Sequence, residues 1–141
     1  MSYVWEIMEQ INWKDEKYSV GNDEFDQAHK KLISLINQLY IYINEGVVRE
    51  KINDILEQLT IYAKEHFSNE ELLMMNKDYP DLAAHQLEHK LFISELAKLH
   101  DKYRNNKNLV SVQLLYFLKD WLISHILHTD KKYATYFKHS S

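Results

Sequence analysis

The scarcity of helix-breaking residues is the strongest constraint on the fold of this chain. Only 2 glycines and 1 proline occur among its 141 residues. A sheet protein of this length needs many tight turns, and such turns depend on glycine and proline. With 45% hydrophobic residues, the chain also has enough apolar side chains for the core of one ordinary domain. These features predict an all-α protein made of long helices with few connections.

The spacing of apolar residues predicts four helices, over about 23–44, 49–75, 81–103 and 109–128. Asn22 or Asp23 can cap the first helix, and Glu45-Gly46 can end it. Because the connections are short, we expect an up-down-up-down antiparallel four-helix bundle. The predicted single domain, 1–141, comprises an N-terminal arm (1–21), the bundle (22–128) and a C-terminal tail with a short helix (129–141).

Composition and charge exclude several classes of function. The chain has no cysteine, which excludes disulfides, thiol catalysis, zinc–thiolate sites and iron–sulfur clusters. A net charge of −4 without a basic stretch along one face argues against a nucleic-acid partner. The most apolar stretch contains Lys119 and Asp120, which disfavour membrane insertion, and the N-terminal residues do not resemble a signal peptide. We therefore expect a cytoplasmic protein.

Histidines and one glutamate interrupt the apolar faces of the predicted helices. The second helix has an H-x-x-x-E pair and the third has an H-x-x-x-H pair. Residues four apart on a helix point the same way, so each pair can approach one ion. The first and fourth helices add one histidine each. The set is His29, His66, Glu70, His85, His89 and His125.

Antiparallel packing brings these residues to one end of the bundle. The candidates are early in the first and third helices and late in the second and fourth, so all fall at the same end. Asp130 is a seventh candidate, five residues after His125, which is a rotation of about 140° in a regular helix. We therefore expect the fourth helix to end or distort near His128-Thr129, so that Asp130 turns back toward the others.

Together these seven groups favour a metal site. A single inward histidine is more often a core residue than a ligand, but burying so many polar groups without a metal would be costly. Imidazole with carboxylate suits iron. Five imidazoles, two bridging carboxylates and a bridging hydroxide leave one coordination position open on two octahedral ions. His100, His128 and His139 do not fit the set, and we interpret them as solvated or locally hydrogen-bonded.

The pattern H…H-x-x-x-E…H-x-x-x-H…H-x-x-x-x-D resembles the hemerythrin family, especially its single-domain bacterial members. The resemblance covers nearly the whole chain. It includes Trp13, the Y-S-V-G lead-in at 18–21, D-x-x-H at 26–29 and the T-D-K-K-Y sequence at 129–133. All seven ligand positions of the family are present.

The resemblance implies two iron ions, cycling between Fe2+ and Fe3+ and bridged by Glu70, Asp130 and an oxo or hydroxo group. It implies that one iron is six-coordinate and the other five-coordinate. The six-coordinate iron would take His85, His89 and His125, and the five-coordinate iron would take His29 and His66. It also implies an apolar oxygen pocket of Leu32, Phe67, Trp121, Leu122 and Ile126. The implied function is reversible binding of dioxygen for storage or delivery.

The donor set favours a carrier over an enzyme. Ferritin-like di-iron oxidases use four carboxylates and two histidines, whereas five neutral histidines hold back further oxidation of the iron. Two alternatives stay open: an oxygen or redox sensor or interaction module, and a di-iron enzyme acting on peroxide or nitric oxide. A protein partner that consumes oxygen also stays open. Asp26 can orient His29 or can be a solvated acid at the helix start.

Overall fold

The structure, a computed structural model, describes residues 10–46, 49–105 and 107–139. It contains four long helices, α3 (Asp23–Glu45), α4 (Arg49–Asn76), α5 (Leu82–Asn105) and α6 (Lys107–Ser124). A short α2 (Asp15–Tyr18) precedes them, and a π-helical turn, η1 (His125–Asp130), joins α6 to α7 (Lys131–His139). The described residues include no strand, so the all-α prediction is confirmed.

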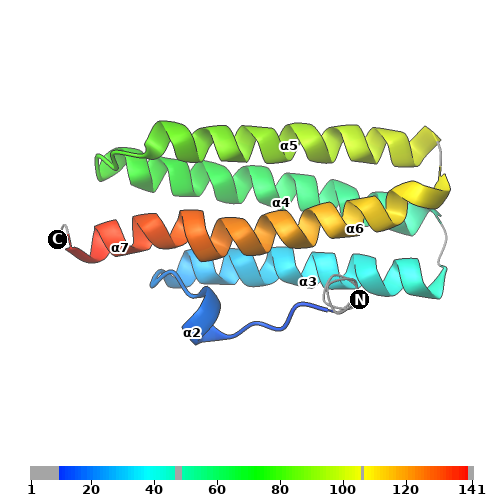
Figure 1. Cartoon of the computed structure of the whole chain (residues 1–141), viewed down its shortest axis with the longest axis horizontal. Coiled ribbons are helices and arrows are strands. Elements are labelled where there is room, and N and C mark those ends of the chain that lie inside the picture. The colour runs from blue at the N-terminus through cyan, green and yellow to red at the C-terminus, as the bar shows by residue number, and fades with distance from the viewer. Residues whose placement is uncertain (1–9, 47–48, 106, 140–141) are drawn as a thin grey trace.

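The four long helices form an up-down-up-down bundle, as predicted. α3 packs against α4 and α6, and α5 packs against the same two helices. The starts of α3 and α5 lie at the same end of the bundle as the ends of α4 and α6, and α6, η1 and α7 follow one continuous path (Figure 1). We call this the ligand end, and the opposite end the far end.

Both predicted caps of the first helix are present. The side chain of Asn22 accepts a hydrogen bond from the Phe25 backbone N–H at 3.1 Å, which satisfies one free donor of the first turn. Gly46 adopts a left-handed conformation with φ of 65° and its N–H donates to the Ile43 carbonyl. Glycine reaches this conformation without steric cost, so it ends α3 cleanly.

The interior consists of two apolar clusters. The larger fills the bundle, and its fully buried members toward the far end are Leu39, Leu56, Leu96 and Leu114. The smaller covers the ligand end and consists of Val20, Phe25, Met74, Tyr79 and Tyr133. Between the two apolar clusters, the interior of the ligand end is lined by polar residues.

Part of the predicted N-terminal arm lies along α3. The Ile11 N–H donates to Asn37 Oδ1 at 2.7 Å, and Asn37 Nδ2 donates to the Ile11 carbonyl at 2.8 Å. This reciprocal pair fixes the arm to the helix. Residues 1–9 of the predicted arm lie outside the described residues. Within the described part of the chain, no helix is long and apolar enough to cross a membrane.

Candidate metal centre

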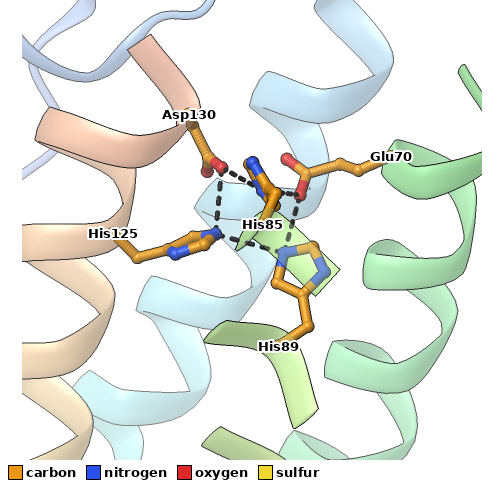
Figure 2. A group of neighbouring side chains, drawn as sticks. All are labelled: Glu70, His85, His89, His125 and Asp130. Atoms are coloured by element: carbon orange, nitrogen blue, oxygen red, sulfur yellow. Dashed lines mark hydrogen bonds and ion pairs between the residues drawn. The ribbon is translucent and has the colours of Figure 1, made fainter. Parts of the chain in front are cut away.

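All seven residues predicted to bind metal meet at the ligand end. Each has at most 4% of its surface exposed. α3 supplies His29, α4 supplies His66 and Glu70, α5 supplies His85 and His89, and η1 supplies both His125 and Asp130. Figure 2 shows five of these side chains converging from three parts of the bundle.

The π-helical turn η1 brings Asp130 to the site. A π-helix bonds residues five apart, so its first and last residues here come to nearly the same side. His125 Nε2 and Asp130 Oδ1 are accordingly 3.0 Å apart. The predicted distortion of the helix is confirmed, but it begins at His125, earlier than the predicted His128-Thr129. The helix does not end there, because the wider turn realigns the chain and lets it continue as α7.

The donors form two groups that share a carboxylate. One group is Glu70, His85, His89, His125 and Asp130, and the other is His29, His66 and Glu70. Glu70 directs Oε2 toward His29 and His66, at 3.4 and 3.1 Å. Its other oxygen, Oε1, faces His85 and His89 at 3.6 and 3.3 Å. Each Glu70 oxygen therefore faces a different group.

The two oxygens of Asp130 also face different donor groups. Its Oδ2 lies 3.1 Å from Nε2 of His29, and its Oδ1 lies 3.1 Å from His85 and 3.0 Å from His125. Two ligands at right angles on one octahedral ion, each about 2.1 Å from it, lie about 3 Å apart. The observed separations fit donors that would surround two ions, and each carboxylate faces both donor groups.

Several polar atoms at the site are buried without a hydrogen-bond partner among the described residues. They include His66 Nε2, His85 Nε2, Glu70 Oε1 and both carboxylate oxygens of Asp130. Leaving such groups unpaired in an apolar interior costs several kcal/mol in total, at about 1–3 kcal/mol each. These atoms are the ones that a metal ion would bind, so the residues present fit a metal centre.

Histidines and carboxylates at the site shift one another's pKa. Burial alone would lower the pKa of His29, but Asp130 and Glu70 outweigh it and raise that pKa to about 9. Burial likewise opposes the charge of His125, whose pKa Asp130 raises to about 10. For Glu70, burial would raise the pKa, yet the charge of His66 and hydrogen bonds from the histidines hold it well below its usual range. The carboxylates therefore stay ionised and need compensating positive charge.

Comparison with known proteins identifies the family. Residues 20–137 match the family described as the hemerythrin HHE cation binding domain.

The chain belongs to the hemerythrin family. The bacteriohemerythrin of Clostridium acetobutylicum is 36% identical to it, over 86% of this chain and 96% of that protein. The myohemerythrin of Theromyzon tessulatum is 32% identical, over 92% of this chain and 96% of that protein. A solved wild-type hemerythrin aligns with a TM-score of 0.79 at 28% identity, covering 90% of this chain and 97% of the other. The resemblance and the fold class are thereby confirmed.

All five residues expected to form the hemerythrin oxygen pocket lie in or against the larger apolar cluster, and two of them contact candidate ligands. Leu32, Phe67, Leu122 and Ile126 are buried in the larger apolar cluster, and Trp121 packs against it. The ring of Phe67 stacks on His89 at 3.8 Å between centroids, and Trp121 stacks on His125 at 4.3 Å. These contacts make one wall of the hemerythrin centre apolar.

Sequence reasoning missed three residues that contact the candidate ligands. Glu71 contacts His89, and Glu88 contacts His125 and Thr129. The hydroxyl of the buried Tyr133 donates to Glu70 Oε2 at 2.7 Å. Helical spacing could have indicated Tyr133, three residues after Asp130, but it does not select Glu71 and Glu88, which stand next to candidate ligands in the sequence.

The side chains of Asp26, His100 and His128 form no hydrogen bond with the candidate metal ligands in the described part of the chain. Asp26 does not orient His29, because its oxygens accept hydrogen bonds from the Ser19 hydroxyl and the Val20 N–H. It fixes the lead-in to α3. His100 is buried and bonds Asn53 at 3.1 Å, and His128 is exposed, as expected for histidines outside the site. The side chain of His139 lies outside the described residues.

Proposed function

We propose that this chain binds dioxygen reversibly at two iron ions for storage or delivery. The observation that carries the proposal is the pair of buried donor groups joined by a shared carboxylate at one end of the bundle. In this proposal His85, His89 and His125 hold one iron, and His29 and His66 hold the other. Glu70 and Asp130 bridge the two, together with an oxo or hydroxo group.

The chemistry of the donors supports iron. Imidazole nitrogens and carboxylate oxygens bind first-row metals of intermediate softness, and no thiolate is available in this chain to favour zinc or copper. The two carboxylates offset two positive charges, and the five imidazoles add none. A pair of ferrous ions, when bound, supplies the electrons that reversible binding of dioxygen requires.

The surroundings of the donors support a carrier. Leu32, Leu122 and Ile126 are buried, so they exclude water from the side of the centre on which they lie. Phe67 and Trp121 stack on His89 and His125 and restrain the two imidazole rings. A dry wall and restrained ligands favour release of unchanged dioxygen, because external protons are kept from the site.

The test is anaerobic reconstitution of the intact chain with ferrous iron, followed by cycles of air exposure and deoxygenation. We expect about two irons per chain and an absorption band that appears in air and disappears under argon over repeated cycles. Stopped-flow mixing with dioxygen separates a carrier from an enzyme, since a carrier returns to the deoxygenated form and an enzyme turns over.

Two results would contradict the proposal. One is native protein that contains a single tightly bound zinc and no iron. The other is iron-loaded protein that consumes dioxygen without recovering its starting spectrum. Zinc in recombinant material alone is weaker evidence, because zinc binds such sites more tightly than ferrous iron does.

A further inference from the structure

Two carboxylates outside the seven-residue set contact ring nitrogens that face away from the centre. Glu71 Oε2 lies 2.7 Å from Nδ1 of His89, and Glu88 Oε1 lies 2.9 Å from Nδ1 of His125. The Thr129 hydroxyl lies 2.9 and 3.0 Å from the two oxygens of Glu88, which holds that carboxylate in place. Both contacted histidines belong to the same donor group.

These contacts determine which nitrogen of each ring carries the hydrogen. An ionised carboxylate only accepts hydrogen bonds, so Nδ1 of His89 and Nδ1 of His125 must be the donors. When the rings are neutral, as metal binding requires, each presents an unprotonated Nε2 to the centre. The two Nε2 atoms lie 3.1 Å apart, so in that state both lone pairs point toward the place that one metal ion would occupy.

The other donor group lacks this support. Nδ1 of His29 is buried without a hydrogen-bond partner among the described residues, and so is Nδ1 of His85 in the first group. The carboxylates in contact with His29 and His66, in the same part of the chain, are Glu70 and Asp130, which approach from the side of the centre. Two of the three imidazole rings in the first group therefore have a carboxylate behind them, whereas the carboxylates that contact the second group approach only from the side of the centre.

We propose that Glu71 and Glu88 are positioning residues that make the half containing His85, His89 and His125 the tighter of the two metal sites. Each carboxylate fixes the ring tautomer and increases the basicity of the nitrogen that binds metal. The inference rests on the proposed metal centre, but it needs neither iron nor dioxygen.

Both carboxylates are partly exposed to solvent, so substituting them should not open the core. The Glu71 side chain is 27% exposed and borders a groove that also contains Lys64 and Lys90. The Glu88 side chain is 42% exposed and borders a crevice beside Thr129. Variants at these positions should fold, because they remove no buried apolar surface.

The experiment measures zinc affinity of the intact chain by competition with a chelator at fixed pH. Glu88→Ala and Glu71→Ala should each weaken binding of the tighter zinc by about 10–100-fold, while the weaker zinc changes little. Glu88→Gln should lose less zinc affinity than Glu88→Ala, because its amide oxygen still accepts a hydrogen bond from Nδ1. The zinc affinity of Thr129→Val should lie between those of the parent and Glu88→Ala. Glu65→Ala and Glu95→Ala, at exposed positions on the same two helices, are the matched controls.

Nitrogen-15 NMR of the zinc-loaded chain supplies a second measurement. If Glu71 and Glu88 had only a structural role, their substitution would not change the histidine Nδ1–H signals. We expect hydrogen-bonded Nδ1–H signals from His89 and His125. Glu71→Ala should shift only the His89 signal and Glu88→Ala only the His125 signal, with Glu88→Gln restoring it in part.

The outcomes separate this inference from the proposed function. Unchanged zinc affinity and unchanged Nδ1–H signals in the alanine variants would overturn the positioning role, even if the protein carries oxygen. Equal weakening of both zinc ions would also overturn it, since the asymmetry would be absent. If zinc binding responds as expected but the iron form binds no dioxygen, the positioning role stands and the proposed function fails.

Discussion

The two ends of the bundle are built from opposite kinds of side chain. At the far end, Leu39, Leu56, Leu96 and Leu114 are fully buried and meet in one apolar cluster. At the ligand end, the same helices bury histidines and carboxylates instead. Apolar burial stabilises a fold under any condition in which water is the solvent, whereas buried charges do so only when they are compensated.

This difference assigns separate tasks to the two ends. The far end brings the helices together whether or not metal is bound. The ligand end then presents preformed donors, and its stability depends on what neutralises them. Perturbations of the ligand end should therefore change the metal centre, and perturbations of the far end should change only the stability of the fold.

Glu70→Ala should have the largest effect on the metal centre. Glu70 faces both donor groups, so its loss removes a ligand from each proposed ion and leaves the Tyr133 hydroxyl without its partner. His29→Ala removes one ligand from one ion. Iron content by mass spectrometry should fall further in Glu70→Ala than in His29→Ala. Iron at the parent level in the Glu70 variant would refute the bridging role.

A rise in pH above neutrality should destabilise the metal-free protein but not the metal-loaded protein. The raised pKa values of His29 and His125, about 9 and about 10, mean that their charged forms stabilise the metal-free fold fully below the ordinary value of 6.5. That contribution is lost as pH rises through 9 to 10. Metal binding requires neutral imidazole, so the zinc-loaded protein should gain stability as pH rises through about 6.5, where the histidines of the unfolded chain lose their protons, and keep it as pH rises further.

Thermal melting of both forms at several pH values from about 6 to about 10.5, which bracket that range, checks this expectation. Parallel pH dependence in the two forms would mean that the histidines do not exchange protons for metal. Glu70→Gln, measured without metal, should flatten the pH dependence of the metal-free form, because one of the two negative charges is gone.

Leu122→Ala should leave iron content near that of the parent and speed loss of the oxygenated form. Leu122 is 3% exposed and stands three residues before His125, one turn back on the same face. A smaller side chain admits water and external protons, which give bound oxygen a route out in reduced form. The measurement is the decay rate of the oxygenated absorption band in air. A rate equal to that of the parent would remove Leu122 from the oxygen pocket.

Leu56→Ala, at the far end, should have the smallest effect on the metal centre. Its side chain is fully buried, so truncation should cost about 2–5 kcal/mol of folding stability. Iron content and the decay rate of the oxygenated form should match the parent at temperatures well below the melting point. A comparable loss of iron in Leu56→Ala and Glu70→Ala would show that the two ends are not separate.

The fold and the seven-residue set could be predicted because both depend on helical spacing. Steps of three and four residues identified the helices, and the order of the helices brought the candidates to one end. Glu71 and Glu88 could not be predicted in this way, because each is adjacent in sequence to a predicted ligand and contacts a histidine on a neighbouring helix. Such a contact depends on how two helices are rotated relative to each other, which spacing along one helix does not specify.

Asp26 illustrates a different limit. Its position three residues before His29 suggested a contact within one helix, yet its oxygens bind Ser19 and Val20 in the preceding segment. The start of a helix has free backbone groups and a nearby chain that compete for the same carboxylate. Spacing alone could not decide between these partners.

The π-helical turn also makes segment length more important than residue identity between His125 and Asp130. A regular α-helix with the same number of residues would rotate Asp130 by about 140° from His125, and would turn everything after it as well. Tyr133 would turn with it and lose Glu70. Single substitutions at exposed His128 leave that geometry intact. Insertions in this six-residue stretch should therefore be far less tolerated than substitutions, whereas deletion of one residue would leave His125 and Asp130 four apart on one face of a regular α-helix.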